Sequence, residues 1–252
     1  MTAKFESERR RALTMMTANE AQGAARIAGC GYAAIFVLAI LANFFVLVPL
    51  GVRGDAAATA ANIAAAEPAV RAAVAAFVAV LVIDLVVGWA LFVALQPAGA
   101  SLSLLMLIFR VAYTVSHVGV VLDLLGALSF ATAPAWAAPL GAGSPALSYH
   151  FFASHGLGFT VTLIFFGVHL LLLGALIARS GYMPRAIGWL AGLAGLAYVG
   201  DGFGTILLGS YGDHAGAVSA VVVVTALVGE GALMLWLMIW GVRKASFPGA
   251  TA

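Results

Sequence analysis

The sequence predicts an all-α integral membrane protein, a bundle of six transmembrane helices. Of its 252 residues, 63% are hydrophobic and only 9% are charged, whereas soluble domains carry about 25% charged residues. The apolar residues form long uninterrupted runs, and a bilayer-spanning α-helix needs roughly 20 such residues. Because too few charges remain to cover a water-exposed surface, we expect the lipid bilayer to surround most of the chain.

The apolar runs divide the chain into three parts. The predicted spans are about 26–50, 69–95, 101–131, 150–178, 185–208 and 216–242. A polar N-terminal segment (1–25) precedes this transmembrane domain (26–243), and a short tail (244–252) follows it. Prolines and glycines predict a loop between the third and fourth spans. The alanine-rich stretch 54–67 is interpreted as a short helix at the outer membrane surface, with a solvated loop as the alternative.

The distribution of basic residues predicts that both termini are cytoplasmic, because Lys and Arg of short loops stay on that side. With this orientation, Arg53 and Arg71 lie outside and Arg110 lies within the membrane. The remaining basic residues are all cytoplasmic: Lys4, Arg9, Arg10, Arg11, Arg26, Arg179, Arg185, Arg243 and Lys244. The N-terminus does not resemble a cleaved signal peptide, since basic and acidic residues alternate there, so the first span is expected to direct its own insertion.

Several functions are excluded by residues that the chain lacks. Cys30 is the only cysteine, so neither an intrachain disulfide nor a CxxC redox pair can form. Lys4 and Lys244 are the only lysines and lie outside the predicted spans, which excludes a retinal Schiff base within the membrane. The sequence contains no Walker-type phosphate loop, and the formal net charge of +2 gives no support to nucleic-acid binding.

The fifth predicted span is rich in glycine. Its glycines are Gly188, Gly192, Gly195, Gly200, Gly202, Gly204 and Gly209. Gly188 with Gly192 and Gly200 with Gly204 are four positions apart, a spacing that allows two helix backbones to approach closely, and this interpretation is favoured. The alternative is a broken helix that exposes backbone groups beside Asp201, as in some transporters.

Ionisable residues inside the predicted spans are the main functional signal. Each costs about 2.5–3.5 kcal/mol at the bilayer centre unless it finds a partner. Interpolation along the spans places one group of five between mid-membrane and the cytoplasmic third: Asp84, Arg110, His117, His169 and Glu230. A second group lies nearer the outer face: Asp123, His155 and Asp201. We expect the deeper five to face one another around a small cavity, and Asp123 with Asp201 to be candidates for a second, outer site.

Arg110 should form an ion pair, because its guanidinium cannot lose its charge. Asp84 and Glu230 are the only carboxylates at matching depth. On the same helix, Arg110, Tyr113 or Thr114, and His117 recur at spacings of three, four and seven, which places them along one face. The structural interpretation of this face is a polar seam in which Arg110 holds helices together and His117 bonds to a carbonyl or hydroxyl group.

Two chemical interpretations compete with a purely structural one, in which the chain is a membrane scaffold or a partner subunit with no chemistry of its own. In a proton-linked transporter or sensor of small molecules, the carboxylate not paired with Arg110 would take up and release a proton. In a metal-dependent intramembrane enzyme, His117, His169 and Glu230 or Asp84 would bind zinc. Haem held by His117 with His169 or His155 is a further possibility. The transporter or sensor is preferred, and no cofactor is predicted. His150 and His155 are interpreted as structural residues, because the surrounding aromatic residues Tyr149, Phe151 and Phe152 are typical of an interfacial belt.

One string resembles a known family. GVHLLLLGALIARSGYMPRAIGWLAGLAGLAYVGD (167–201) is similar to the bacterial membrane-protein family catalogued as domain of unknown function 4386. RIAGCGY (26–32), GDAAATAANI (54–63) and LIFRVAY (107–113) resemble other parts of its pattern. The resemblance implies a multi-pass protein of a bacterial cytoplasmic membrane and assigns no activity.

Overall fold

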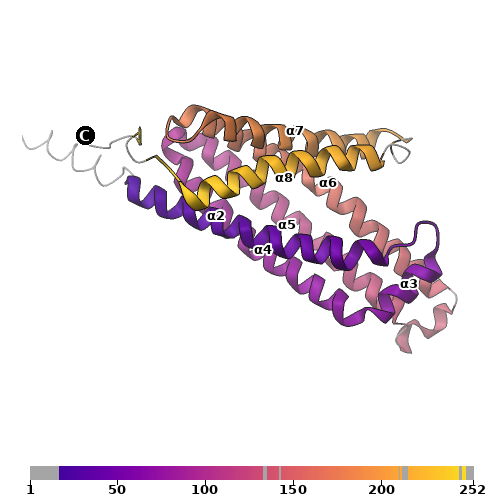
Figure 1. The fold of residues 1–252 in the computed structure, drawn as a ribbon. Helices are drawn as coiled ribbons and strands as arrows, with labels where there is room; N and C mark the ends of the chain where they lie inside the picture. Colours follow the sequence, from indigo (N-terminus) through magenta and orange to yellow (C-terminus); the bar gives the residue numbers. More distant parts are fainter. Residues whose placement is uncertain are drawn as a thin grey trace, which may run out of the picture.

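The protein consists of α-helices joined by short connections (Figure 1). The computed structural model describes residues 17–132, 135–141, 143–209, 211, 215–243 and 246–247, and these contain no strand. The α-helices are α2 (Ala18–Ile40), α3 (Ala56–Ala65), α4 (Glu67–Leu95), α5 (Ala100–Ala131), α6 (Gly143–Ser180), α7 (Arg185–Leu207) and α8 (Ala215–Ile239). A π-helical segment, η1 (Leu41–Leu47), follows α2, and short 3-10 segments are η2 (Val48–Leu50), η3 (Gln96–Ala98) and η4 (Ala135–Leu140).

Six helical segments of the described chain are long and apolar enough to cross a membrane, which confirms the predicted number. They are Ala18–Leu50, Glu67–Ala98, Ala100–Ala131, Gly143–Ser180, Arg185–Leu207 and Gly216–Ile239. The chain is therefore a multi-pass membrane protein.

The first helix is longer at its N-terminus than the predicted span, which began at residue 26. It begins at Ala18, because Thr17 and Glu20 form a capping box. The Glu20 amide donates to Thr17 Oγ1 over 3.2 Å, and the Thr17 amide donates to the Glu20 carboxylate over 2.8 Å. These two bonds satisfy free amides of the first turn. Residues 1–16 of the predicted polar segment, and most of the predicted tail, lie outside the described residues.

The fourth helix also begins earlier than predicted, at Gly143 instead of residue 150. Pro145 lies in its first turn, where a missing amide hydrogen breaks no helical bond. Two serines fix this first part of α6 to the end of α5: Ser144 Oγ donates to the Phe130 carbonyl over 2.7 Å, and Ser148 Oγ to the Ala127 carbonyl over 2.8 Å. The predicted loop is shorter because these bonds extend the helix.

The predicted short helix between the first two spans is confirmed as α3. Asp55 caps it by accepting a hydrogen bond from the Ala58 amide over 2.8 Å. Thr59 is buried, and its Oγ1 accepts a bond from the Val52 amide over 2.9 Å. Ile63 is buried beside it, against residues of α4 and α5. The position of α3 at the outer membrane surface stays a prediction.

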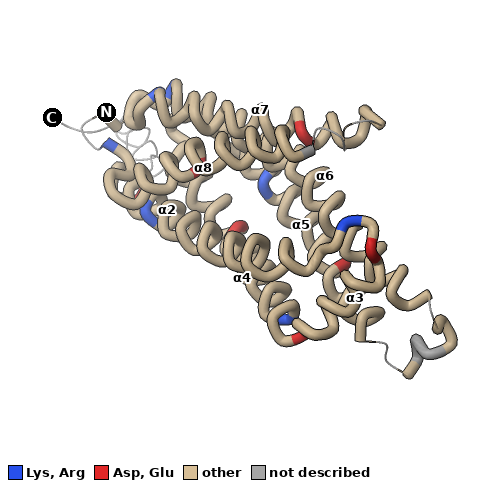
Figure 2. The backbone as a smooth tube through the Cα atoms, turned by 45° about the vertical axis from the view of Figure 1, so that its right-hand side comes forward, with Lys and Arg blue, Asp and Glu red and all other residues tan. Residues whose placement is uncertain are grey.

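The start of α2, the turn between α6 and α7, and the end of α8 lie together at one end of the bundle. The Gln22 side chain donates to the Trp240 carbonyl over 3.0 Å, and the Arg243 amide donates to the Tyr182 carbonyl over 2.9 Å. Tyr182 is buried there, and burial raises the pKa of its hydroxyl, which stays a neutral donor to the Ala94 carbonyl. Charged residues lie toward the ends of the bundle and also at a few positions along its middle (Figure 2). The cytoplasmic position of this end stays a prediction.

Helices α2 and α8 touch at this end and diverge toward the other (Figure 1). At the contact, a Cβ added to Gly29 would lie 2.5 Å from the Met238 amide nitrogen, so the two backbones are in direct contact. Helix α6 packs against α5 on one side and α7 on the other, and α2 packs against α4. The space between the separated halves of α2 and α8 is where the functional site lies.

Helices α6 and α7 pack through glycines. A Cβ added to Gly195 would lie 2.6 Å from the Gly167 carbonyl oxygen, and one added to Gly188 would lie 2.6 Å from the Gly174 carbonyl oxygen. Helix α7 is a continuous α-helix from Arg185 to Leu207. Close packing of the fifth span is therefore confirmed, and the alternative of a broken helix is wrong. The closest contacts are made by Gly188 and Gly195 and not by the predicted four-residue pairs, since nothing lies within 4 Å of a Cβ added to Gly192 or Gly200.

This contact predicts different outcomes for two glycines on the same helix. Gly195→Ala should lower the stability of the protein by about 1–3 kcal/mol, because the added methyl group forces backbones apart. Gly192→Ala is the matched control, since nothing lies within 4 Å of its added Cβ, and alanine favours the helix. Thermal unfolding of both variants in mild detergent, followed by tryptophan fluorescence, checks this. Equal unfolding temperatures would contradict the packing argument.

Candidate functional site

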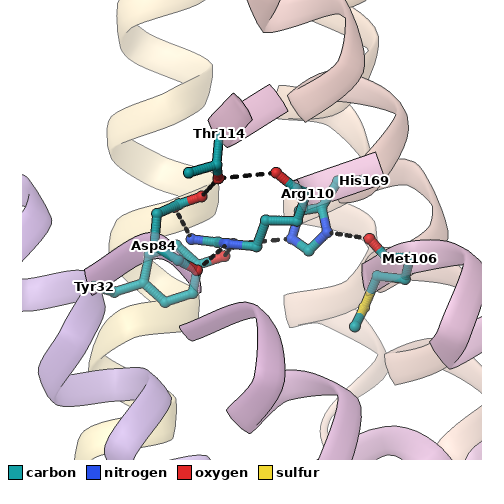
Figure 3. A network of polar contacts seen from close by, with 6 residues as sticks. All are labelled: Tyr32, Asp84, Met106, Arg110, Thr114 and His169. Carbon is teal, nitrogen blue, oxygen red and sulfur yellow. Dashed lines mark hydrogen bonds and ion pairs between the residues drawn. The ribbon is translucent and has the colours of Figure 1, made fainter. Parts of the chain in front are cut away.

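Arg110 of α5 lies at the centre of a buried polar network, with 1% of its surface exposed. Its Nη2 lies 2.5 Å from Asp84 Oδ1 on α4, and its Nε donates to the Asp84 carbonyl over 3.2 Å (Figure 3). The second carboxylate oxygen of Asp84 accepts a bond from Thr114 Oγ1 over 2.5 Å. The predicted ion pair is thus present, and Asp84 rather than Glu230 is the partner.

Two further helices complete the network around the same guanidinium. Arg110 Nη1 donates to Tyr32 Oη on α2 over 2.7 Å and lies 3.0 Å from His169 Nε2 on α6. His169 Nδ1 lies 2.9 Å from the Met106 carbonyl oxygen (Figure 3). Since a carbonyl only accepts and a guanidinium only donates, these contacts assign the proton of a neutral His169 to Nδ1. We call Tyr32, Asp84, Met106, Arg110, Thr114 and His169 the Arg110 network.

The network is closed to further partners. Both carboxylate oxygens of Asp84 and both ring nitrogens of His169 are already bonded. Asp84 and Arg110 have opposite charges, so the pair is neutral as a whole. The guanidinium also lies over two aromatic rings, 4.9 Å from the centre of Tyr32 and 5.3 Å from that of Phe166, and such contacts favour a desolvated cation. This arrangement joins α2, α4, α5 and α6.

A cavity of about 440 Å³ lies beside the network, between α2 with η1 and α8, and reaches α4, α5, α6 and α7. This is within the size range of small-molecule sites, about 300–1,000 Å³. Its walls are mostly apolar. The polar side chains among its lining residues are Asn43, Tyr113, His117, His155, Thr160, Tyr198, Asp201, Ser219 and Glu230.

Glu230 of α8 is the deepest carboxyl group that faces this cavity. Only 6% of its surface is exposed, and its Oε1 accepts a hydrogen bond from Tyr198 Oη of α7 over 2.7 Å. In the described part of the chain, the ion pairs join Arg110 with Asp84 and Arg71 with Glu67, and neither involves Glu230. Glu230 therefore faces a mostly apolar cavity. Its carboxyl group is in direct contact with the Tyr198 hydroxyl group and with no cationic side chain.

The two cavity histidines are held by hydrogen bonds within the helix bundle. His117 Nδ1 lies 2.7 Å from Thr162 Oγ1, and its ring packs against Tyr113 and Phe159, with ring centres 5.1 and 4.9 Å away. His155 Nδ1 lies 2.8 Å from the Val120 carbonyl oxygen, so this nitrogen carries the ring proton. His155 is buried and lines the cavity, and its bond to the Val120 carbonyl is compatible with the predicted structural role.

The structure divides the five deep residues predicted to share one cluster. Asp84, Arg110 and His169 belong to the closed network and do not line the cavity, whereas His117 and Glu230 do. The separation arises because equal depth does not fix the direction in which a helical side chain points.

The two outer candidates are also separated. Asp201 lines the cavity and accepts a hydrogen bond from Tyr211 Oη over 2.9 Å. Desolvation and this hydrogen bond raise the pKa of Tyr211 to about 12, so its hydroxyl stays a neutral donor. Asp123 is half-buried on α5 and is not among the residues that line the cavity. The predicted joint site of Asp123 and Asp201 is therefore not assembled in the cavity.

The proposed metal ligands hold separate partners. His169 bonds to Met106 and Arg110, His117 to Thr162, and Glu230 to Tyr198. Across the described ranges, no three His, Cys, Asp or Glu side chains are grouped closely enough to hold a metal ion.

Sequence reasoning missed several polar residues of the site, among them Tyr32, Tyr198 and Asn43. Tyr32 and Tyr198 bond to Arg110 and Glu230, and Asn43 lines the cavity from the π-helical segment η1. These residues are polar side chains well inside apolar runs, and the same criterion identified the charged residues of the site. A π-helical turn inside a helix often marks a functional site, but its position is not readable from sequence.

A second hollow, of about 640 Å³, lies on the outside of the bundle between α6 and α7. Its floor contains the packed glycines Gly174 and Gly188, and its only ionisable lining residues are Arg179 and Arg185 near the helix ends. Although it is larger, it contains neither a carboxyl group nor a histidine, so we place the candidate site in the cavity beside Glu230.

Comparison with known proteins supports the resemblance seen in the sequence. The family model described as Domain of unknown function (DUF4386) matches residues 27–241. An uncharacterized protein of Archaeoglobus fulgidus is 32% identical over 157 residues, which cover 62% of this chain and 75% of that protein. No solved structure matches the chain. Since this relative is archaeal, the bacterial source implied by the resemblance stays a prediction.

The network predicts that Arg110 is essential for stability. Arg110→Ala should cost about 3–5 kcal/mol and lower the amount of folded protein, because Asp84 is left buried without its cation. The control is Arg71→Ala, which breaks the exposed pair with Glu67 and should cost at most about 1 kcal/mol. Abundance in membranes and unfolding temperature in detergent measure both effects. An Arg110→Ala protein as abundant and stable as the wild type would show that the network is dispensable.

Proposed function

The chain belongs to the DUF4386 family, and we propose that it is a proton-linked transporter of small molecules in a cytoplasmic membrane. The observation that carries the proposal is Glu230, a buried carboxyl group that faces a ligand-sized cavity and has no cationic side chain in direct contact. A carboxylate in apolar surroundings is strongly disfavoured without a counter-charge. It therefore binds either a proton or a positively charged partner, and the two compete.

The surroundings of Glu230 support a role in which its charge changes while the fold persists. The Tyr198 hydroxyl can keep its hydrogen bond to Glu230 in both protonation states. It donates to the carboxylate, and it can donate to or accept from the carboxylic acid. Asp84, by contrast, is held by Arg110 and Thr114. These contacts support a division in which Asp84 stabilises the fold and Glu230 is available for a ligand-linked proton.

The helices around the cavity also suit a passage that opens and closes. Helices α2 and α8 touch at Gly29 and Met238, and the cavity lies between their more separated halves. Movement of these halves about the close contact would change access to Glu230. A sensor would use the same coupled binding without a passage, and a flux measurement separates the two.

Protonation of Glu230 can be tested without knowing the substrate. A high-frequency infrared carbonyl band, typical of a protonated carboxyl group in apolar surroundings, should appear in acidic buffer and disappear in alkaline buffer, and this band should be absent in Glu230→Gln. Glu67→Gln, which removes the same charge from an exposed position, should retain the change. If the wild-type and Glu230→Gln spectra respond to pH identically, Glu230 does not carry the proton.

The predicted orientation has its own test in intact cells. In a Cys30→Ser background, Arg53→Cys should react with a membrane-impermeant maleimide from outside. Arg179→Cys should react only after the membrane is permeabilised, because the basic end of the bundle is predicted to be cytoplasmic. Reversed labelling would place both termini outside.

A further inference from the structure

Two acidic side chains and no permanent cation are among the residues that line the cavity. Glu230 and Asp201 both line it, and the lining residues include neither Lys nor Arg. The nearest permanent cation on α5, Arg110, is neutralised by its ion pair with Asp84. A positively charged ligand could thus enter without displacing an existing ion pair.

The other titratable groups around Glu230 do not supply a fixed positive charge. Tyr198 of α7 bonds to it directly, and Tyr32 of α2 belongs to the Arg110 network with Asp84 of α4. The cavity groups on α5 and α6 are Tyr113, His117 and His155, and each histidine has one ring nitrogen in a hydrogen bond to a neutral group. Tyrosines are neutral or negative, so only a histidine could become positive here.

The walls of the cavity suit an apolar molecule that bears a positive charge. Aromatic rings line several sides: Phe36, Phe44, Phe77, Tyr113, Phe159 and Tyr198. The faces of such rings attract organic cations, and the attraction grows when the cation is desolvated. Aliphatic side chains from α8, including Val222, Val223 and Leu227, complete the lining. A strongly hydrated metal ion or an anion would find few suitable partners in these walls.

We propose that the cavity binds lipophilic organic cations, with Glu230 as their counter-ion. These cations would be the substrate class of the proposed transporter, so the inference rests on the proposed function. As the cation enters, the proton on the Glu230 carboxyl group leaves to water, so the total charge of the occupied cavity stays the same. Asp201 lines the same cavity and adds to its negative character. Acidic conditions should therefore weaken cation binding, because protons compete for Glu230.

The position of the cavity suggests access from the membrane. It lies between α2 with η1 and α8, and two lining residues from opposite sides, Phe44 and Leu227, have 48% and 49% of their surfaces exposed. In a membrane-spanning bundle, exposed apolar side chains at this depth face lipid. Lipophilic cations partition into the bilayer and could enter between these helices.

The proposal is tested with a matched pair of probes, methyltriphenylphosphonium and its uncharged analogue triphenylphosphine oxide. Binding to the purified full-length protein in detergent would be measured by isothermal titration calorimetry. The cation should bind at least about tenfold more tightly than the neutral analogue, a difference of about 1.4 kcal/mol. Glu230→Gln should lose this preference, whereas Glu67→Gln should keep it. Equal binding of both probes, or an unchanged preference in Glu230→Gln, would overturn the proposal.

Separate controls distinguish the substrate class from proton coupling. Asp201→Asn should weaken cation binding without removing its dependence on pH. If the Glu230 infrared band changes with pH but the cation binds no more tightly than the neutral analogue, the substrate class is wrong and proton binding by Glu230 stands. If the cation binds through Glu230 equally well at acidic and alkaline pH, the cation site stands and the proton-linked function is wrong. Unfolding temperatures of all variants verify that each protein is folded.

Discussion

The burial of one permanent cation constrains the whole bundle. Arg110 cannot shed its charge and lies in the interior of an apolar protein, so it must find a carboxylate and further acceptors inside the bundle. Those partners come from α2, α4 and α6 as Tyr32, Asp84 and His169. A helix that moved away would leave a buried polar group without its bond. The network therefore fixes the mutual positions of four helices more strictly than apolar packing alone could.

This constraint also determines which carboxyl group remains available for chemistry. Asp84 and Glu230 are both buried and come from helices on different sides of the bundle. Because Arg110 pairs with Asp84, Glu230 is left with a tyrosine hydroxyl as its direct partner. A neutral partner holds the position of a carboxyl group without fixing its charge. The fold thus assigns stability to one acidic residue and leaves the other facing a cavity, where a proton or a cation can bind.

The sequence was sufficient for the number of spans, the short helix α3, the glycine packing of α7 and the need for an Arg110 ion pair. These follow from length, composition and the cost of a buried charge, which are local properties. The separation of Glu230 from Asp84 and His169 was not predictable, because depth along a helix is readable from sequence while the facing direction depends on how helices pack. Tyr198 was missed for the same reason, since its importance arises only from contact with Glu230.

The two ways in which helices meet explain why the cavity lies beside α8. Between α6 and α7, glycines bring backbone against backbone along the helices, at Gly167 with Gly195 and Gly174 with Gly188, so the hollow along this pair lies on the outside of the bundle. Helices α2 and α8 have a comparable contact only near one end, at Gly29. Beyond it, η1 widens the helical turn, so Ala42 and Leu47 pack into the core while Asn43 lines the cavity. Backbone contact thus closes one helix pair at several levels, whereas the other pair touches near one end, and the space beyond that contact is the one that Glu230 faces.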